Sequence, residues 1–489
     1  MSATVAPRLF ERVRLLMIKP PDYPHSAAFD ELSIGLGAAF AGLGAQVDRA
    51  VNQPLSGEGV NLVFGAHLIA PQVSLPANSI IVNAEQIRSG QFVQPHYLDL
   101  LQRHAVLDYS PRNVALLRER LGHAHVHVLK LGYAAALSRI KNAPQPDIDV
   151  LFYGSINERR KRILDALAAA GLKVHVLTGV YGAERDALIA RSKVVLNVHY
   201  YDDKIHEVVR SSYLLANRKC VLSECDADTE IEPDLRAAVV PVAYAQVVEA
   251  CIALVRDEAR RRAQEQNGFE IFARRDQAAL LAEVLPRLSL PLPGRINLGS
   301  GKAFDAAQLN IDINPQWQPD VLGDLTAPAG LRQIFFSRRF GLLRLDPDEF
   351  DEISAIDVLE HVPDLVGLMT RCLELLRTGG AMRIGVPYDL SWGAWQDPTH
   401  IRAFNERSWL YYTDWHWYLG WVHARFVLSD IKMALSPVGD ALRQRGASND
   451  EIFRTPRGVD NMQVVLTKRL LTEQEKRQAG AWHSGAPLT

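Results

Sequence analysis

Residues 295–301 read RINLGSG, a short apolar run that leads into a glycine-rich turn. Without side chains at Gly299 and Gly301, the backbone can turn tightly and approach a ligand closely. The strand expected at 309–315 contains Asp312, whose carboxylate could accept two hydrogen bonds from a ribose diol. Asp312 follows Gly301 by eleven positions (312 minus 301), against roughly 20 in the dinucleotide fingerprint. The spacing therefore disfavours NAD, and by itself the G-x-G pattern fits a purely structural turn as well as a ligand site.

Three further landmarks follow this turn in chain order. The stretch 320–328 places Asp324 at the end of a third strand. Residues 350–364 predict a strand that runs into a Glu-His pair, and residues 369–388 predict a helix, a Gly-Gly turn and another strand.

Taken in order, these landmarks resemble the class I S-adenosylmethionine-dependent methyltransferases, in the branch that acts on small molecules and cell-surface polysaccharides. The resemblance covers about residues 294–440 and implies S-adenosylmethionine as the cofactor. It implies that the glycine turn passes the methionine part, that Asp312 holds the ribose hydroxyls and that Asp324 faces the adenine amino group. The implied cofactor-binding residues are Gly299, Ser300, Gly301, Asp312, Asp324 and Glu360.

The loop 393–409 contains DPTH at 397–400, which resembles a segment that lies over the cofactor near the acceptor in the same branch. Methyl transfer to a hydroxyl needs a base, and a histidine with a pKa near neutrality suits that task. His400 is the first catalytic candidate and His361 the second, with Asp397 beside them; alternatively, His400 only fixes its own loop through a backbone hydrogen bond. Asp397 and His400 could share a metal, but no third ligand is evident, so no metal is predicted.

Aromatic residues gather in the same part of the chain. Six of the eight tryptophans fall between residues 392 and 421, together with three tyrosines. Their flat faces could bind sugar C–H groups, with Trp395 as the candidate contact. Core packing or a domain interface explains the cluster equally well.

In the first half of the chain, apolar runs alternate with helical stretches, as in parallel sheets covered on both faces. Helices are expected at 28–47, 111–122, 158–171, 206–218 and along 247–275. The expected strands are 12–18, 61–67, 79–85, 104–110 and 125–132, then, after a Pro-containing linker, 148–155, 173–179, 193–200 and 219–224.

Two such units with a linker between them and a long closing helix resemble the two-lobed (GT-B) glycosyltransferases, which use nucleotide-sugar donors. The resemblance covers about residues 10–285. Proteins bind a donor diphosphate through cations or the N–H groups at a helix N-terminus, and they bind sugar hydroxyls through acidic side chains. Retaining members commonly carry two glutamates flanking seven residues, whereas this chain has Tyr213 at the second position. The candidate donor-site residues are Arg160, Lys161, Arg210, Tyr213 and Glu224, with Glu207 as a catalytic candidate; a solvated basic helix face is the alternative for the first two.

Composition narrows the possible partners. The 489 residues include 54 Lys and Arg against 56 Asp and Glu, so no global charge attracts nucleic acid, and none is expected as a partner. The four cysteines form no metal or disulfide pattern, which favours a reducing cytoplasm. No signal peptide or membrane-spanning segment is expected.

We therefore expect an α/β protein with three Rossmann-like units, a two-lobed GT-B-like module followed by a class I methyltransferase domain. The main boundary falls in the proline-containing stretch 285–294. The expected domains are an N-terminal lobe at 1–140, a nucleotide-sugar lobe at 141–288, the methyltransferase domain at 289–470 and a frayed polar tail at 471–489.

The sequence predicts a bifunctional enzyme that transfers a sugar from a nucleotide-sugar donor and O-methylates a glycan with S-adenosylmethionine, in surface polysaccharide biosynthesis such as that of lipopolysaccharide or capsule. The acceptor would be a glycan or a lipid-linked saccharide, and membrane contact would be peripheral. Two alternatives stay open. The first half could only bind sugar and present the acceptor to the methyltransferase, or the whole chain could be a non-enzymatic assembly scaffold.

Overall fold

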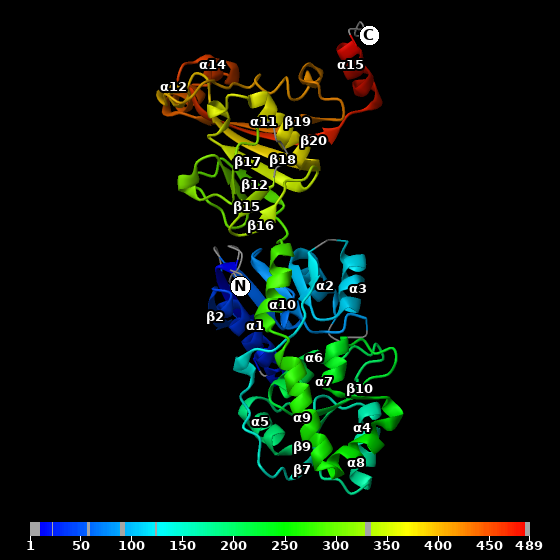
Figure 1. The fold of residues 1–489 in the computed structure, drawn as a ribbon. Coiled ribbons are helices and arrows are strands. Elements are labelled where there is room, and N and C mark those ends of the chain that lie inside the picture. The colour runs from blue at the N-terminus through cyan, green and yellow to red at the C-terminus, as the bar shows by residue number, and fades with distance from the viewer. Residues whose placement is uncertain are drawn as a thin grey trace. The chain divides into compact units, whose positions relative to one another are not determined.

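The computed structural model describes the chain except for residues 1–9, 22, 56–58, 89–92, 123–124, 328–333 and 485–489. The chain forms two compact units, Met1–Pro291 and Leu292–Thr489 (Figure 1). The first unit contains two sheets, each in its own lobe, and the second contains one large sheet and a two-stranded ribbon. Within the described ranges, no helix is long and apolar enough to cross a membrane.

The first lobe is built on a parallel sheet with the strand order β2-β1-β3-β4-β5-β6. Its strands are β1 (Arg12–Met17), β2 (Gln46–Val51), β3 (Val60–Phe64), β4 (Ser79–Asn83), β5 (Ala105–Asp108) and β6 (Val126–Val128), and its helices are α1 (Asp30–Gly42), α2 (Pro95–Arg103) and α3 (Pro111–Leu121). The helix expected at 28–47 is therefore too long. It ends at Gly42 because Gly44 adopts a left-handed φ of 89°, and β2 follows directly.

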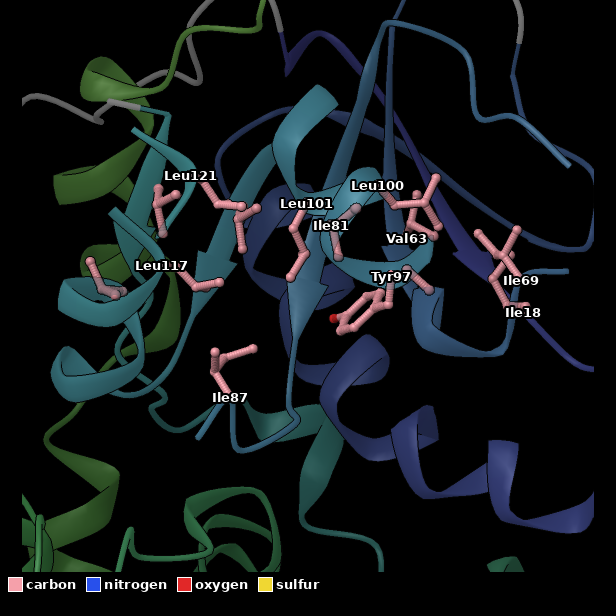
Figure 2. Close-up of a cluster of buried hydrophobic side chains, with 14 of the residues drawn as sticks. Ile18, Val63, Ile69, Ile81, Ile87, Tyr97, Leu100, Leu101, Leu117 and Leu121 are labelled. Atoms are coloured by element: carbon pink, nitrogen blue, oxygen red, sulfur yellow. The ribbon is translucent and has the colours of Figure 1, made fainter. Parts of the chain in front are cut away.

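Apolar side chains between this sheet and its covering helices form the core of the first lobe (Figure 2). Ile81 of β4, Leu101 of α2 and Leu117 of α3 are fully buried there. Tyr97 of α2 is also buried, and its hydroxyl donates a hydrogen bond of 2.7 Å to Asn83 at the end of β4. The strands are hydrophobic because both faces of the sheet are covered.

The second lobe repeats the arrangement, with the strand order β11-β10-β9-β7-β8. Its strands are β7 (Ile148–Tyr153), β8 (Val174–Leu177), β9 (Ser192–Asn197), β10 (Cys220–Glu224) and β11 (Val240–Val242), and its helices are α4 (Glu158–Ala169), α5 (Gly182–Arg191), α6 (Val208–Ala216), α7 (Pro233–Ala238), α8 (Val247–Arg256) and α9 (Glu258–Ala273). The helical run expected at 247–275 is two helices. Asp257 separates them because its side chain caps the N-terminus of α9.

The chain then returns to the first lobe, where α10 (Gln277–Val284) packs against α1 (Figure 1). A buried ion pair and a hydrogen bond also join the lobes. Glu31 of α1 accepts a hydrogen bond of 2.7 Å from Arg185 of α5, and both side chains are buried. Glu230 of the second lobe accepts a hydrogen bond of 2.6 Å from the Ser110 hydroxyl of the first. The two lobes are therefore fixed to each other by polar contacts as well as by the returning helix.

The second unit has a seven-stranded sheet with the order β14-β13-β12-β17-β18-β20-β19, in which β20 runs antiparallel to both neighbours. Its strands are β12 (Arg295–Leu298), β13 (Leu309–Asp312), β14 (Val321–Leu322), β17 (Phe350–Ile356), β18 (Leu376–Pro387), β19 (Ala424–Leu435) and β20 (Val459–Leu470), beside the ribbon of β15 (Phe335–Ser337) and β16 (Gly341–Leu343). Its helices are α11 (Leu365–Leu375), α12 (Gly393–Gln396), α13 (Pro437–Gln444), α14 (Asn449–Arg454) and α15 (Glu473–Ser484). The three sheets confirm the predicted α/β class with Rossmann-like units.

The tail expected at 471–489 is not frayed over its described part, because residues 473–484 form α15. Thr472 and Glu475 form a reciprocal capping box at its start: the Thr472 N–H donates to the Glu475 carboxylate at 2.9 Å, and the Glu475 N–H donates to the Thr472 hydroxyl at 3.3 Å. Arg425 also donates to Glu475, at 2.9 Å, and so holds the helix to β19. Residues 485–489 lie outside the described residues.

Helix α9 packs closely against α7 at Gly268, so a substitution at Gly268 tests this packing. A Cβ at Gly268 would lie 2.5 Å from the backbone oxygen of Ala238, whereas a Cβ at Gly42 in α1 would have its nearest neighbour at 3.9 Å. We expect Gly268→Ala to lower the free energy of unfolding by about 1 to 3 kcal/mol, because the helices must move apart. Gly42→Ala should leave it unchanged or raise it by less than about 1 kcal/mol. Urea unfolding of both variants measures this, and equal midpoints would contradict the packing.

Candidate functional site

The first unit contains a cleft of about 330 Å³ between its two lobes. The first lobe lines it with residues that follow β1, β4 and β5, and the second with residues that follow β7, β8 and β9 and with the start of α6. Each sheet reverses its strand order at one place, between β1 and β3 in the first lobe and between β7 and β9 in the second. Ligands of open α/β sheets bind beyond the carboxyl ends of the strands at such a reversal.

An ionic cluster of Glu207, Arg160 and Arg210 forms one wall of this cleft. Glu207 pairs with the buried Arg160 and, at 2.7 Å, with Arg210. Burial raises the pKa of Glu207, but the charges of Arg210 and Arg160 outweigh this effect and hold the pKa below its ordinary value. Two cations against one anion leave the cluster with a net positive charge. The backbone approaches it closely, since a Cβ at Gly154 would lie 2.8 Å from the Arg210 guanidinium.

Two of the predicted donor-site residues lie outside the cleft. Lys161 is exposed on α4 and pairs with Asp165 at 2.6 Å, one helical turn away. Glu224 is fully buried at the end of β10, where both carboxylate oxygens accept hydrogen bonds from Arg159. These placements correct the prediction for both residues, because each side chain already has a partner away from the cleft. Glu207, the catalytic candidate, does face the cleft.

Tyr213 of α6 lines the cleft, but its hydroxyl has partners on both sides. It donates a hydrogen bond of 2.7 Å to Asp186 and accepts one of 3.0 Å from Arg139. Burial raises its pKa to about 12, so the phenol stays neutral at ordinary pH. At the position that the resemblance compares with the second glutamate, the chain therefore has a neutral, hydrogen-bonded phenol.

Sequence reasoning missed Glu85, which lines the cleft from the first lobe. Burial raises the pKa of its carboxyl to about 7. The neighbouring His67, whose Nε2 lies 3.7 Å from the carboxylate, offers no compensating charge, because burial lowers the pKa of His67 to about 4. A carboxyl that titrates near neutrality in a cleft can exchange a proton with a ligand. Its place just after β4 was the available signal, but no motif marks it.

In the second unit, the glycine turn after β12 meets the end of β13. Gly299 and Gly301 have positive φ values of 63° and 47°, and the Gly301 N–H donates a hydrogen bond of 2.8 Å to Asp312. A Cβ at Gly299 would lie 2.4 Å from the side chain of Val358, which follows β17. The turn thus brings three strand ends together at the place where the sheet reverses its order, between β12 and β17.

The other predicted cofactor residues lie around this turn with different environments. Ser300 is buried, and its hydroxyl has no hydrogen-bond partner among the described residues. Asp324 is exposed after β14, and one of its oxygens accepts hydrogen bonds from the backbone and hydroxyl of Thr326, at 2.8 and 2.7 Å. Asp312 accepts a second hydrogen bond of 2.8 Å from the Asn314 N–H. Each oxygen of Asp312 retains a further lone pair, so the residue can still accept hydrogen bonds from a diol.

A second cleft, of about 500 Å³, brings together the predicted catalytic residues of this unit. Glu360 and His361 reach it from the segment after β17, and Asp397 and His400 reach it from the loop after β18. The two imidazole rings have their centroids 4.6 Å apart. The structure therefore joins two motifs that are about 40 residues apart in the chain.

Hydrogen bonds fix the orientation of both rings. The Nδ1 atom of His400 lies 3.1 Å from the backbone oxygen of Ala394, so the loop-fixing bond considered from the sequence is present. The Nδ1 atom of His361 lies 2.9 Å from the hydroxyl of Thr399, which donates in turn to Asp397 at 2.7 Å. Both of these hydrogen bonds involve Nδ1, so Nε2 of each ring is not used to fix its orientation.

The predicted aromatic cluster divides between core and surface. Trp409 and Trp421 are buried, whereas Trp392 and Trp395 are 61% and 65% exposed. The indole N–H of Trp395 donates to the backbone oxygen of Asp389 at 3.0 Å, and Trp395 does not line the cleft. Trp392 does line it, and the Arg457 guanidinium lies 3.7 Å from the centre of the Trp392 ring. Trp392 is therefore better placed than Trp395 to contact a ligand there.

No family model matches the chain. Among curated proteins, an uncharacterized protein of Acanthamoeba polyphaga mimivirus is 29% identical over 153 residues, which cover 30% of this chain and 49% of that protein. A second uncharacterized mimivirus protein is 27% identical over 145 residues, which cover 28% of this chain and 19% of that protein. The chain spans about half or less of the length of the curated relatives it matches.

Several solved structures are similar to parts of the chain. A SAM-dependent methyltransferase from Archaeoglobus fulgidus is 15% identical, with 39% of this chain and 91% of that chain covered and a TM-score of 0.26. A glycosyltransferase from Rickettsia africae is 8% identical, with 56% and 98% covered and a TM-score of 0.37. HepE from Anabaena, solved with UDP and glucose, is 14% identical, with 57% and 100% covered and a TM-score of 0.39. Both kinds of transferase named from the motifs thus occur among the similar structures.

The largely buried carboxyl of Glu85 generates a pH-dependent prediction. Its pKa of about 7 in the folded protein exceeds the ordinary 4.5, so between these pH values the folded state holds a proton that the unfolded state has lost. The free energy of unfolding contributed by Glu85 must therefore fall as pH rises through this window. We expect Glu85→Gln to match the native protein near pH 4 and to exceed it by roughly 1 to 3 kcal/mol at pH 8. Urea unfolding across pH measures this.

The exposed Glu119 of α3 provides the control, because Glu119→Gln removes a carboxylate from the same lobe without changing a buried site. Its difference from the native protein should not vary with pH over this range. A constant difference for Glu85→Gln as well would show that Glu85 titrates normally.

Proposed function

We propose that the chain is a bifunctional transferase in surface polysaccharide biosynthesis, which adds a sugar from a nucleotide-sugar donor in the first unit and O-methylates a glycan with S-adenosylmethionine in the second. The acceptor would be a growing glycan, free or lipid-linked. The observation that carries the proposal is the convergence of most of the predicted residues at the carboxyl ends of parallel strands in both units. Two active sites on one chain raise the effective concentration of a shared acceptor.

The glycine turn and Asp312 support the methyl-transfer part of the proposal. At Gly299 and Gly301 no side chain blocks the approach of a ligand to the backbone. The buried Ser300 hydroxyl has no hydrogen-bond partner among the described residues, and the Asp312 carboxylate can accept further hydrogen bonds from a diol. These features fit S-adenosylmethionine, which would supply an electrophilic methyl group. His361 and His400 lie in a cleft at the same edge of the sheet, where they could receive the proton of the acceptor hydroxyl.

Calorimetric titration of S-adenosylmethionine and S-adenosylhomocysteine tests this unit. We expect saturable binding by the native protein and at least a tenfold weaker affinity in Asp312→Ala, because the variant loses the carboxylate that joins the turn to β13. Asp430→Ala is the control, since Asp430 lies on β19 and pairs with Lys432. Its affinity should equal that of the native protein. Absence of binding by the native protein would refute the methyltransferase proposal.

The ionic cluster supports donor binding in the first unit. Arg160 and Arg210 share one carboxylate, so the wall of the cleft keeps a positive charge for a diphosphate. The helix α6 begins beside this cluster, with Val208 and Val209 lining the cleft, and a helix N-terminus attracts anions.

Titration with UDP, GDP and ADP and their sugar esters tests this site. We expect one nucleotide series to bind, and Arg210→Ala to weaken it at least tenfold because a charge-assisted contact to the diphosphate is lost. Lys161→Ala is the matched control, because it removes a cation from the adjacent helix without touching the cleft. If both variants lost the same affinity for the nucleotide, the binding would be a nonspecific attraction of anions, which would contradict a specific donor site in the cleft.

A second candidate function for the first unit is sugar binding without transfer. The neutral Tyr213 and the doubly paired Glu207 favour it, because neither side chain is an evident nucleophile or base. Release of nucleoside diphosphate from a bound nucleotide sugar, in the presence of glycan acceptor, would decide for the transferase. Donor binding without release would decide for the binding module.

A further inference from the structure

We propose that Glu360, His361 and His400 form a binding site for a divalent transition-metal ion of the zinc class. One possible ligand atom from each of the three residues lies within 4.8 Å of the others. The residues come from two separate segments, one after β17 and one after β18, and both face the second cleft. The sequence had paired only Asp397 and His400, and the fold supplies the further ligands.

The hydrogen bonds of His400 leave a lone pair for a cation. Its Nδ1 lies 3.1 Å from the backbone oxygen of Ala394, and a carbonyl oxygen can only accept, so Nδ1 carries the hydrogen. In the neutral ring, Nε2 is then unprotonated. A second ring nitrogen bound to a backbone carbonyl is the usual way in which proteins orient a metal-binding histidine.

The same reasoning applies to His361 through two hydrogen bonds. The Thr399 hydroxyl donates its one hydrogen to Asp397 at 2.7 Å, so it accepts from Nδ1 of His361 at 2.9 Å. The Nε2 atom of His361 is therefore also unprotonated. Asp397 acts through Thr399 as a positioning residue, and its other oxygen remains 4.0 Å from Nε2 of His400, beyond a hydrogen bond.

Glu360 gives an independent reason to expect a ligand. The residue is only 1% exposed, and neither carboxylate oxygen has a hydrogen-bond partner within the described part of the chain. A buried carboxyl without a partner is costly, and a cation that joins the two histidines would satisfy it. The backbone oxygen of Glu360 accepts a hydrogen bond of 3.0 Å from Ile401, which fixes this residue beside the loop that carries His400.

The donor set indicates the class of ion. Two imidazole nitrogens and one carboxylate suit Zn²⁺, Co²⁺, Ni²⁺ or Fe²⁺ better than Mg²⁺ or Ca²⁺, which prefer oxygen ligands. Metal–ligand bonds of about 2.1 Å place ligand atoms roughly 3 to 4 Å apart, so a small side-chain rotation brings the three onto one ion. Three protein ligands leave at least one position open to the cleft, where water or a hydroxyl could bind.

The ion site does not require the proposed methyl transfer, and only its consequence rests on that function. A bound ion would occupy the histidine lone pairs and would itself lower the pKa of a coordinated acceptor hydroxyl. The histidines could then no longer accept the proton of the acceptor hydroxyl, and a carboxylate of the same cleft, such as that of Asp397, would receive it instead. Metal binding in the absence of S-adenosylmethionine can be measured separately from cofactor binding.

The experiment is a calorimetric titration of Zn²⁺ into the full chain after removal of metal with a chelator, paralleled by the visible absorption of bound Co²⁺. We expect one saturable equivalent, with at least a tenfold loss of affinity in His400→Ala and in Glu360→Gln. His423→Ala is the control, because His423 is an exposed histidine outside the cluster, and its affinity should not change. The Co²⁺ spectrum should show nitrogen ligation in the native protein and should be lost with His400.

Two results would overturn the inference. One is the absence of saturable binding by the native chain, and the other is equal affinity in the native chain, His400→Ala and Glu360→Gln. Thermal unfolding without metal checks that each variant folds; Glu360→Gln is nearly isosteric and carries the test if His400→Ala does not fold. If S-adenosylmethionine binds but Zn²⁺ does not, only the metal inference fails, and the opposite result would leave it standing without the methyltransferase.

Discussion

The constraint on which the whole molecule depends is that parallel strands end at the same edge of a sheet. A strand that must run in the same direction as its neighbour needs a crossover, and the loops that carry polar side chains then gather beyond the carboxyl ends. Among its parallel strands, each of the three sheets reverses its strand order once, and such a reversal opens a crevice between loops. In the first unit two such edges face one cleft, whereas in the second unit one edge carries both the glycine turn and the histidine cleft.

The buried acidic residues of this chain differ in whether the protein itself compensates their charge. Glu31 and Glu224 are buried against arginines of the protein, so their charges are compensated and they hold the fold. Glu207 is also compensated, but its two arginines exceed its charge and face a cleft. Glu360 has no comparable partner within the described residues, although it is buried just as deeply as Glu31. Unlike the others, it lies where a bound cation would complete the site.

The sequence predicts the strands well because buried parallel strands are continuous apolar runs, such as β3 and β4. It does not predict β2, because this edge strand is exposed and contains the polar residues Gln46, Asp48 and Arg49. It also predicts α8 and α9 as one helix, because only the capping residue Asp257 separates them. Helix geometry explains the difference between Arg160 and Lys161. Successive residues lie about 100° apart around a helix, so one member of a basic run is buried and the next is solvated.

Within the candidate sites, local motifs were predictable and long-range convergence was not. The turn at Gly299 and the acid at Asp312 lie in one short segment of sequence, but the approach of His400 to Glu360 depends on how a loop returns to the sheet. Arg402 anchors that return by donating to the backbone oxygens of Val362 and Pro363, at 2.7 and 2.9 Å. Because these bonds involve backbone atoms, they set the distance between the two histidine-bearing segments without using the reactive side chains. The loop therefore shapes the cleft through contacts to the backbone, and the two imidazoles and the Glu360 carboxylate remain available to bind a ligand.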